Sequence, residues 1–376
     1  MELILNSPNK NDDALRQVYI NAFSSAIELF LVTAYLTEWN SDLKLSSKCK
    51  RFRIIIGKDF GITRKSACKD VMRWLPKGRK SQFLVADDIS GFHPKAIFWK
   101  DKNGKHYALI GSSNLSKAAF ESNYEANIFS EISEKSFSDA KKWIHLIEEQ
   151  SVVISEDWLE AYVEGKSSPV KRKSHRNTIV DIPLPTPKDK ETHELLQKRR
   201  KKLKNHRKVE IHFKSLIFDC SKNKITSKNF YAKLPGVWGD EVGNRLQGFG
   251  YEISGKHSDF KQLSKSFIRI IQSNKYEMDD CVVAEIDRLH KLGVPTRGAL
   301  LTEFLCLTFP KRYPVLNKPV KKFLSAIKFK PPRGASEGDK YLDLAKKLRA
   351  SLKQQPKHPA NNLAELDIII WQEYCE

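Results

Sequence analysis

A change of pattern near residue 166 divides this sequence into two parts of different fold class. Residues 1–165 alternate short apolar runs, typical of buried strands, with stretches whose apolar positions recur at helical spacing. That alternation is typical of an α/β domain, in which helices cover a sheet. After residue 209 helical spacing predominates, and Pro or Gly stands at most of the boundaries. Because the chain has 376 residues, each part is long enough to bury its own core.

We therefore expect an α/β domain at residues 1–165, a basic linker or helix at 166–208, and a mainly α-helical domain at 209–376. The strands expected in the first part are 27–33, 52–57, 82–86, 95–100 and 107–110, and its helices are 13–26, 65–74 and 136–150. The last part is expected to begin with a short β-like stretch over 209–220. Its helices are expected at 259–272, 278–292, 298–309, 319–327, 339–354 and 362–374.

The net charge indicates a polyanionic partner. The chain has 66 Lys and Arg against 45 Asp and Glu, a net charge of +21, which favours nucleic acid as a partner. Residues 1–165 hold 23 basic and 22 acidic side chains, whereas 166–208 hold 15 basic and 4 acidic. The nucleic-acid contacts are therefore expected C-terminal to the first domain. The expected residues are Lys198, Arg199, Arg200, Lys201, Lys202, Arg297, Lys311, Arg312, Lys321 and Lys322. The alternative for the run at 198–202 is a solvated helix face or a disordered tail. The alternative near Arg297 is a turn between core helices, and for the cations at 311–322 it is a helix surface along which the lysine side chains extend to water.

Other features bear on the compartment. No apolar run approaches the roughly 20 residues that cross a bilayer, and the N-terminus turns polar too soon for a signal peptide. The six cysteines include no CxxC pair, which argues against a zinc ribbon or a secreted disulfide framework. We expect a cytoplasmic protein with reduced cysteines and no membrane contact.

Three short motifs in the first part carry groups suited to phosphoryl transfer. His93 and Lys95 begin an expected strand and lie two residues apart, so both side chains project from the same face. An imidazole is a plausible nucleophile at neutral pH, and a lysine neutralises phosphate oxygens. The turn at 111–114, GSSN, offers backbone amides, a hydroxyl and a side-chain amide to the same anion. Glu125 is a candidate to hold the imidazole by a hydrogen bond.

In this order, HPK, GSSN and NYE resemble the HxK…GSxN…NxE signature of the phospholipase D superfamily. The resemblance covers residues 1–165 and implies a mixed sheet flanked by helices. It implies that His93 is the nucleophile, that Lys95 and Asn114 hold the phosphate, and that Ser112 and Glu125 support the site. It also implies a covalent phosphohistidine intermediate, so that neither a metal nor a cofactor is expected.

One position departs from the family pattern. Many members place an Asp beyond the lysine where this chain has Lys100, and the nearest acid is Asp101. The departure favours the nuclease branch over the lipid enzymes, which usually carry two motifs or membrane segments. We interpret Ser113 and Ser116 as turn and cap residues and His106 as structural.

The chain holds one such motif, whereas members of the superfamily use two histidines, one to attack phosphorus and one to protonate the leaving oxygen. His212-Phe213-Lys214 has the HxK form but lacks a following GSxN turn, and we interpret it as a chance match. A homodimer through the first domain would supply the second histidine. The sequence thus predicts a metal-independent endonuclease in restriction or phage defence, and double-stranded DNA is the expected substrate. The alternatives are an RNA-cleaving phosphodiesterase and a non-catalytic nucleic-acid-binding protein.

Overall fold

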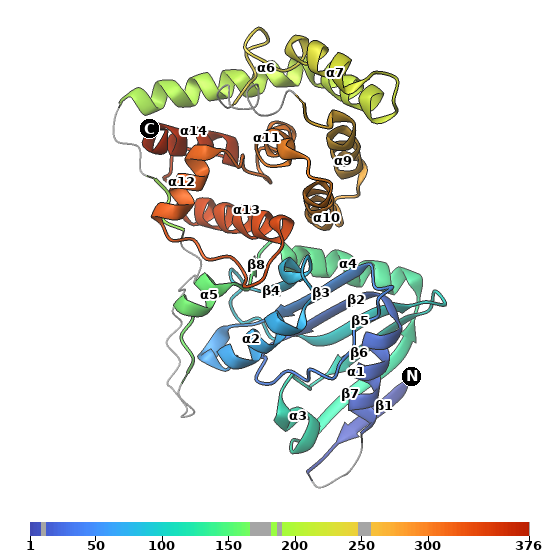
Figure 1. Cartoon of the computed structure of the whole chain (residues 1–376). Helices are drawn as coiled ribbons and strands as arrows, with labels where there is room; N and C mark the ends of the chain where they lie inside the picture. The colour runs from blue at the N-terminus through green and yellow to red at the C-terminus, as the bar shows by residue number, and fades with distance from the viewer. Residues whose placement is uncertain (9–12, 166–181, 186–189, 247–256, 376) are drawn as a thin grey trace. The chain divides into compact units, whose positions relative to one another are not determined.

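The computed structural model describes residues 1–375 except 9–12, 166–181, 186–189 and 247–256. It divides the chain into two compact units (Figure 1). The first comprises Met1–Val180 with Pro332–Gly334, and the second comprises Asp181–Pro331 with Ala335–Glu376. Of the segment expected as a basic linker or helix, 166–208, residues 166–181 and 186–189 lie outside the described residues. No helix in the described part of the chain is long and apolar enough to cross a bilayer.

The first unit is built on an eight-stranded mixed sheet with the order β1-β7-β6-β5-β2-β3-β4-β8. Strands β2, β3 and β4 run parallel, and every other neighbouring pair is antiparallel. The strands are β1 (Glu2–Asn6), β2 (Ala26–Thr33), β3 (Arg51–Ile56), β4 (Phe83–Val85), β5 (Lys95–Asp101), β6 (His106–Gly111), β7 (Glu125–Ile132) and β8 (Val152–Val153). The five expected strands are present, while β1, β7 and β8 were not expected.

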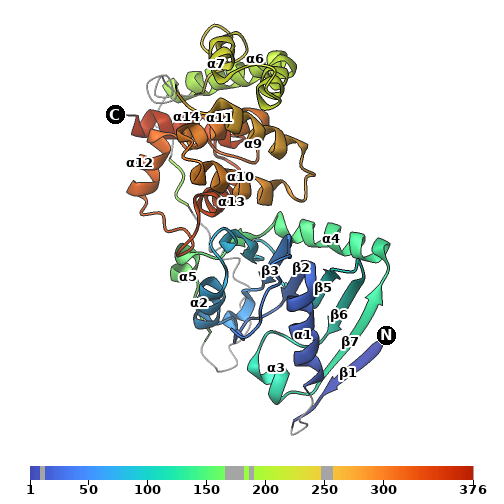
Figure 2. The ribbon, with the colours of Figure 1, turned by 45° about the vertical axis from the view of Figure 1, so that its right-hand side comes forward.

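Helices cover both faces of this sheet (Figure 2). They are α1 (Ala14–Ser25), α2 (Lys65–Trp74), α3 (Lys117–Glu121), α4 (Glu134–Glu148) and α5 (Glu156–Ala161), with 3-10 turns at Asp59–Gly61 and Lys80–Gln82. On one face Phe23 of α1 packs edge-on against Phe52 of β3, with ring centroids 6.1 Å apart. On the other face Phe137 of α4 lies 6.1 Å from the ring of Phe30 in β2. The expected mixed sheet flanked by helices is confirmed.

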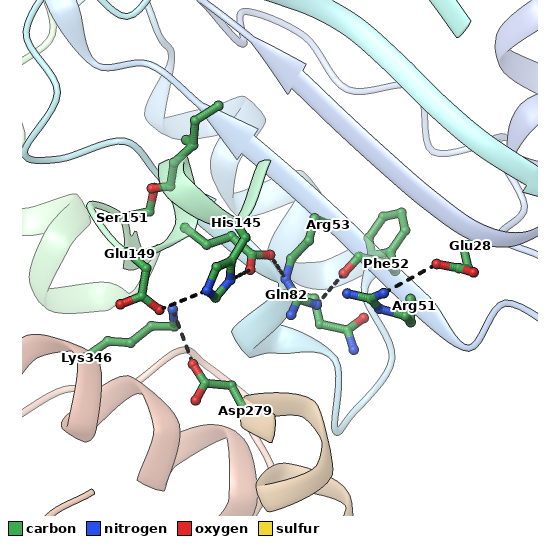
Figure 3. A network of polar contacts seen from close by, with 12 residues as sticks. Glu28, Arg51, Phe52, Arg53, Gln82, His145, Glu149, Ser151, Asp279 and Lys346 are labelled. Carbon is green, nitrogen blue, oxygen red and sulfur yellow. Dashed lines mark hydrogen bonds and ion pairs between the residues drawn. The ribbon is translucent and has the colours of Figure 1, made fainter. Parts of the chain in front are cut away.

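A buried ion pair fixes α4 on its face of the sheet. Arg53 of β3 pairs with Glu148 near the end of α4 and also donates to the Phe52 carbonyl oxygen at 2.7 Å (Figure 3). His145 of α4 lies beside the same carboxylate, 3.6 Å away, and at the same distance from Glu149. Because Arg53 is nearly fully buried, this pairing is needed to compensate the desolvation of its charge.

The second unit is helical throughout its described part. Its helices are α6 (Lys190–Ser221), α7 (Ser227–Lys233), α9 (Phe260–Gln272), α10 (Met278–Lys291), α11 (Ala299–Thr308), α12 (Lys318–Ala326), α13 (Glu337–Gln354) and α14 (Leu363–Tyr374), with 3-10 turns at Leu234–Gly236 and Pro295–Arg297. The six helices expected after residue 259 are confirmed with small shifts at their ends. Helix α6 packs against α9 and α14 (Figure 1).

The β-like stretch expected at 209–220 is wrong, because these residues form the last third of α6. Val209, Ile211 and Phe213 alternate as in a strand. Yet Phe213, Ile217 and Cys220 are the buried residues, and their spacing continues the buried stripe begun by Leu196, Leu203 and His206. Packing of that longer stripe against other helices outweighs the local β pattern. Consequently the expected boundary between linker and helical domain, at 208, falls inside one continuous helix.

Candidate active site and nucleic-acid interface

Four strand ends of the first unit meet at one edge of the sheet. Strands β2 and β6 end there at Thr33 and Gly111, and β5 and β7 begin there at Lys95 and Glu125. The antiparallel register pairs Thr33 with Lys95, and it pairs Gly111 with Asn127, two residues after Glu125. The three motifs, far apart in the sequence, therefore lie along a single edge.

His93 and Lys95 contact each other at this edge. The Lys95 Nζ lies 3.0 Å from Nδ1 and 3.3 Å from Nε2 of the exposed His93 imidazole. Partial burial lowers the pKa of the Lys95 ammonium from its ordinary value, while the nearby Glu125 carboxylate opposes that shift. A cation and an open imidazole are thus presented together, although β5 begins at Lys95 and His93 lies before the strand and not within it.

Glu125 anchors the GSSN turn. The Ser112 hydroxyl donates to Glu125 Oε2, and Asn123 Nδ2 donates to Glu125 Oε1 at 3.1 Å. Ser112 Oγ in turn accepts the Ala126 amide at 3.0 Å. Both oxygens of this buried carboxylate therefore have donors, one from the GSSN turn and one from the NYE motif. Among the described residues no hydrogen bond joins Glu125 to His93, so the expected support of the imidazole is not present within this chain.

Asn114 is oriented by two residues that the sequence analysis missed. Its Oδ1 accepts the Tyr35 amide and the Thr33 hydroxyl, each at 3.3 Å. The Tyr35 ring stands edge-on to the His93 ring, with centroids 5.6 Å apart. Because the Tyr35 amide can only donate, it holds Oδ1 inward, and Nδ2 remains as the donor side of the amide. Residues 33–35 thus link Asn114 to His93.

The loop before His93 is tied down by Asp59, which the sequence analysis also missed. Its Oδ2 accepts the backbone amides of Gly91 at 2.7 Å and Phe92 at 3.2 Å. Asp59 also raises the pKa of the nearby Tyr35 hydroxyl, after burial, the larger cause. The one sequence signal for Asp59 and Thr33 is that each is a polar residue at or after the end of an apolar strand. Such residues are common, so this signal does not single them out.

Gly111 permits the close approach of β6 and β7 at the GSSN motif. A Cβ at this position would lie 2.3 Å from both the Ala126 carbonyl oxygen and Asn127 Oδ1. Any side chain would therefore push apart the two strands that carry Ser112 and Glu125. The glycine of the motif has a packing role, in addition to the amides that its turn offers.

The residues interpreted as structural behave so. Ser113 accepts Asn127 Nδ2 at 2.8 Å in a buried pair, and Ser116 caps α3 by accepting the Ala119 amide at 3.2 Å. His106 is buried, and its ring lies 4.8 Å from Phe137. Asp101, the acid near the departure from the family pattern, accepts the amides of residues 103 and 105 in the β5–β6 turn, and so serves that turn.

The cations expected to bind nucleic acid on α6 differ in exposure, because their positions around the helix axis differ. Arg199 lies on the buried stripe, is 2% exposed and pairs with Asp367 at 2.9 Å, so its assignment as a nucleic-acid contact is wrong. Arg200 pairs with Glu365 at 2.8 Å, and the partly buried Lys202 donates to the Arg245 carbonyl oxygen at 2.6 Å. Lys198 and Lys201 are exposed. Only these last two of the five present an unshared charge in the described structure.

The same helix exposes three further cations that the analysis had not singled out. Lys204, Arg207 and Lys208 are exposed, and no described residue pairs with them. With Lys201 they continue at spacings of three and four residues along the side of α6 opposite the buried stripe. We call Lys198, Lys201, Lys204, Arg207 and Lys208 the α6 cationic stripe. Because the stripe extends over ten residue steps, it is about 15 Å long.

The remaining cations also differ in their surroundings. Arg297 makes a two-point contact with Glu337, at 2.7 and 3.0 Å. Arg312 lies 3.1 Å from the buried Asp279, whose carboxylate also approaches Lys346 at 3.6 Å (Figure 3). Both arginines are therefore structural ion-pair partners. Lys311 and Lys321 are exposed and Lys322 is half-buried, and their side chains have no partner in the described residues.

Part of the first unit matches a known protein family. Residues 20–146 match the family model described as cardiolipin synthase, PLD-like domain. No curated protein matches significantly. Among solved structures, NucT from Helicobacter pylori is similar at 21% identity, covering 41% of this chain and 98% of that one with a TM-score of 0.30. The phospholipase D family member Nuc from Salmonella typhimurium is 18% identical, with 41% and 99% coverage and a TM-score of 0.30. Over residues 20–146, this chain is therefore similar to the phospholipase D-like domain family.

Proposed function

We propose that this protein is a phosphodiesterase that cleaves DNA by way of a covalent phosphohistidine, without a metal ion. The observation that carries the proposal is the convergence of His93, Lys95, Ser112, Asn114 and Glu125 at one sheet edge. There an exposed imidazole touches a lysine, and an amide donor is held nearby by its acceptor side. These are the groups that attack on phosphorus and stabilisation of its oxygens require. A role in restriction or phage defence is part of the proposal.

In the proposed reaction an imidazole nitrogen of His93 attacks phosphorus while the bond to the leaving oxygen breaks. The leaving oxygen takes a proton from a second histidine. Water then attacks the phosphohistidine, the phosphorus–nitrogen bond breaks, and the second histidine takes the proton from water. Lys95 and the Asn114 amide hold the non-bridging oxygens throughout. Ser112 and Glu125 keep the turn that carries Asn114 in place.

The second histidine is proposed to come from a second copy of the chain. Next to the site, β1, β7 and β6 expose an apolar strip on the sheet face that α4 covers farther along. Leu3 pairs in register with Ile128, and Ile128 pairs with Ile110, so these side chains share that face. Each is about half exposed or more, at 63%, 47% and 50%. An uncovered apolar strip beside half of an active site fits a two-fold interface that presents the same patch twice.

The dimer is tested by Ile110→Glu/Ile128→Lys in analytical ultracentrifugation. We expect the parent to sediment as a dimer, and the variant to be monomeric and inactive. Ile20→Lys is the matched control, because Ile20 is 40% exposed on α1, which covers the opposite face. A parent that stays monomeric at micromolar concentration and still cleaves would contradict the shared site.

DNA delivery is proposed to fall to the second unit, because the α6 cationic stripe lies there while residues 1–165 are almost neutral. All six cysteines are free, as expected of a cytoplasmic protein, and we propose that location. Double-stranded DNA is the proposed substrate, and RNA is the alternative.

The deciding experiment incubates the full chain with plasmid DNA and, separately, with RNA, each in excess EDTA. We expect cleavage of DNA that His93→Ala abolishes while DNA binding stays nearly unchanged. His212→Ala is the matched control, since His212 has the same HxK letters but is an exposed residue in the last third of α6. Cleavage of RNA alone would establish the alternative. Near-parental cleavage by His93→Ala, or cleavage that EDTA stops, would overturn the mechanism.

A further inference from the structure

The second unit contains a pocket to which the proposed reaction assigns no role. It has a volume of about 370 Å³ and lies among α10, α11, α12, α13 and the segment that follows α12. That volume falls within the range of roughly 300–1,000 Å³ typical of small-molecule sites. Two of the cations expected to bind nucleic acid, Arg297 and Lys321, line this one pocket although 24 positions separate them.

The walls of the pocket are apolar, and the polar atoms in them are already engaged. The Tyr341 hydroxyl donates to the Pro314 carbonyl oxygen at 2.7 Å, and the Thr302 hydroxyl donates to the Gly298 carbonyl oxygen at 2.6 Å. The apolar lining residues include Ile286, Leu316, Leu324, Phe329, Tyr341 and Leu344. Such walls favour a flat apolar group and do not select particular hydrogen-bonding edges.

The lining also has two unshared positive charges. Lys321 on α12 and Lys340 on α13 are exposed, and neither ammonium has a partner in the described part of the chain. Arg297 differs, because Glu337 neutralises it and its Nη1 donates to the Val294 carbonyl oxygen at 2.9 Å. The pocket therefore combines an apolar interior with two lysines that an anionic group would pair with.

We propose that this pocket binds a nucleotide, with the base against the apolar walls and the phosphate between Lys321 and Lys340. The choice of a nucleotide over other apolar anions rests on the proposed function, in which the second unit delivers nucleic acid. Because the wall polar atoms are engaged, the pocket accepts a base without reading its identity. A base turned out of a strand, or a free mononucleotide, presents the same chemistry.

Isothermal titration calorimetry of the full chain with dAMP tests the proposal. We expect dAMP to bind, and both deoxyadenosine and deoxyribose 5-phosphate to bind at least about tenfold more weakly, because each lacks one half of the ligand. A short single strand with an unpaired adenine that competes with dAMP would identify the extruded base as the source. Absence of dAMP binding at millimolar concentration would overturn the proposal, as would tighter binding of decanoate than of dAMP.

Variants separate the two halves of the pocket. Lys321→Gln and Lys340→Gln should each weaken dAMP about tenfold and leave deoxyadenosine unchanged. Lys318→Gln is the matched control, because Lys318 is exposed on the same helix and lies outside the lining. Equal effects of Lys318→Gln and Lys321→Gln on dAMP would overturn the assignment of the phosphate.

A space-filling variant tests the apolar half. Gly298 lines the pocket, has a φ of −74°, and a Cβ there would meet no atom within 4 Å. Gly298→Leu should therefore fold normally and abolish the binding of both dAMP and deoxyadenosine. Gly236→Leu is its control, because Gly236 has the same open surroundings outside the lining. Unchanged dAMP affinity in folded Gly298→Leu would contradict the site.

The proposal and the proposed function fail separately. His93→Ala should keep the parental affinity for dAMP, because His93 belongs to the first unit. Binding of dAMP by a parent protein that cleaves no nucleic acid would overturn the proposed function and leave the pocket. Cleavage by a parent that does not bind dAMP would overturn the pocket and leave the proposed function.

Discussion

The α6 cationic stripe allows a quantitative prediction for nucleic-acid binding. Lys201, Lys204 and Lys208 follow one another at three- and four-residue spacing, are exposed and have no partner in the described structure. We expect each to neutralise one phosphate, so the triple change Lys201→Gln/Lys204→Gln/Lys208→Gln removes three contacts. At about 0.9 per phosphate, the slope of log K against log salt falls by about 2.7 on duplex DNA. Between about 50 and 200 mM salt, parental affinity should thus fall about 40-fold further than that of the variant.

The assay is fluorescence anisotropy with two unrelated duplexes over this salt range, using His93→Ala as the parent so that DNA is not cleaved. Both duplexes should weaken alike, because phosphate contacts do not read sequence. The control triple Lys44→Gln/Lys48→Gln/Lys50→Gln removes the same charge from exposed positions of the first unit. Equal slope changes for the two triples would refute the reasoning, since net charge rather than the stripe would then carry binding.

Three further predictions concern stability. Ser112→Ala should cost about 1–3 kcal/mol, because the buried Glu125 and the Ala126 amide each lose a partner, and urea unfolding would show no change if those bonds contribute nothing. Phe60 has a φ of 61° and is 64% exposed, so Phe60→Gly should stabilise by about 1 kcal/mol, and a lower urea midpoint would contradict the strain. Burial lowers the pKa of His206 to about 4, so the neutral imidazole favours folding above its unfolded pKa of 6.5. That stability is lost as pH falls through this window, by about 2 kcal/mol at about pH 5. His206→Leu should flatten the urea midpoint between about pH 7 and 5, and an equally steep decline would exclude His206 as the cause.

The sequence pointed to the motif residues of the candidate site, but it did not point to the residues that orient them. His93, Lys95 and the GSSN turn are recognisable because their residue types and order are unusual together. Thr33, whose hydroxyl reaches Asn114 across 81 positions, has no such mark. Its role arises from the register that pairs it with Lys95, and register depends on the assembled sheet. Sequence patterns therefore pointed to the groups that we propose as reacting, and they omitted the residues that orient those groups.

In the fold, too, some elements were predictable from the sequence and others were not. The central strands were predictable because their apolar runs are long, as expected when both faces of a strand are covered. Strand β7 alternates buried and exposed residues over only part of its length. It begins at Glu125, the last residue of the polar NYE motif, so its beginning does not resemble an apolar strand. The β-like interpretation of 209–220 was wrong because a window that short cannot distinguish alternation from helical spacing.

The cationic run at 198–202 explains why charge alone overestimates a binding surface. Five consecutive basic residues cannot all face solvent on a helix that packs against neighbours, since consecutive side chains point about 100° apart. Here the buried direction falls on Arg199, which requires an acid as partner, and Asp367 lies 168 positions away in sequence. No local pattern announces that partner. The positive charge that remains available to a polyanion must instead lie on the side of α6 opposite its buried residues. For this reason we expect the lysines at 204 and 208, which the sequence analysis did not single out, to contribute more to nucleic-acid binding than the arginines at 199 and 200.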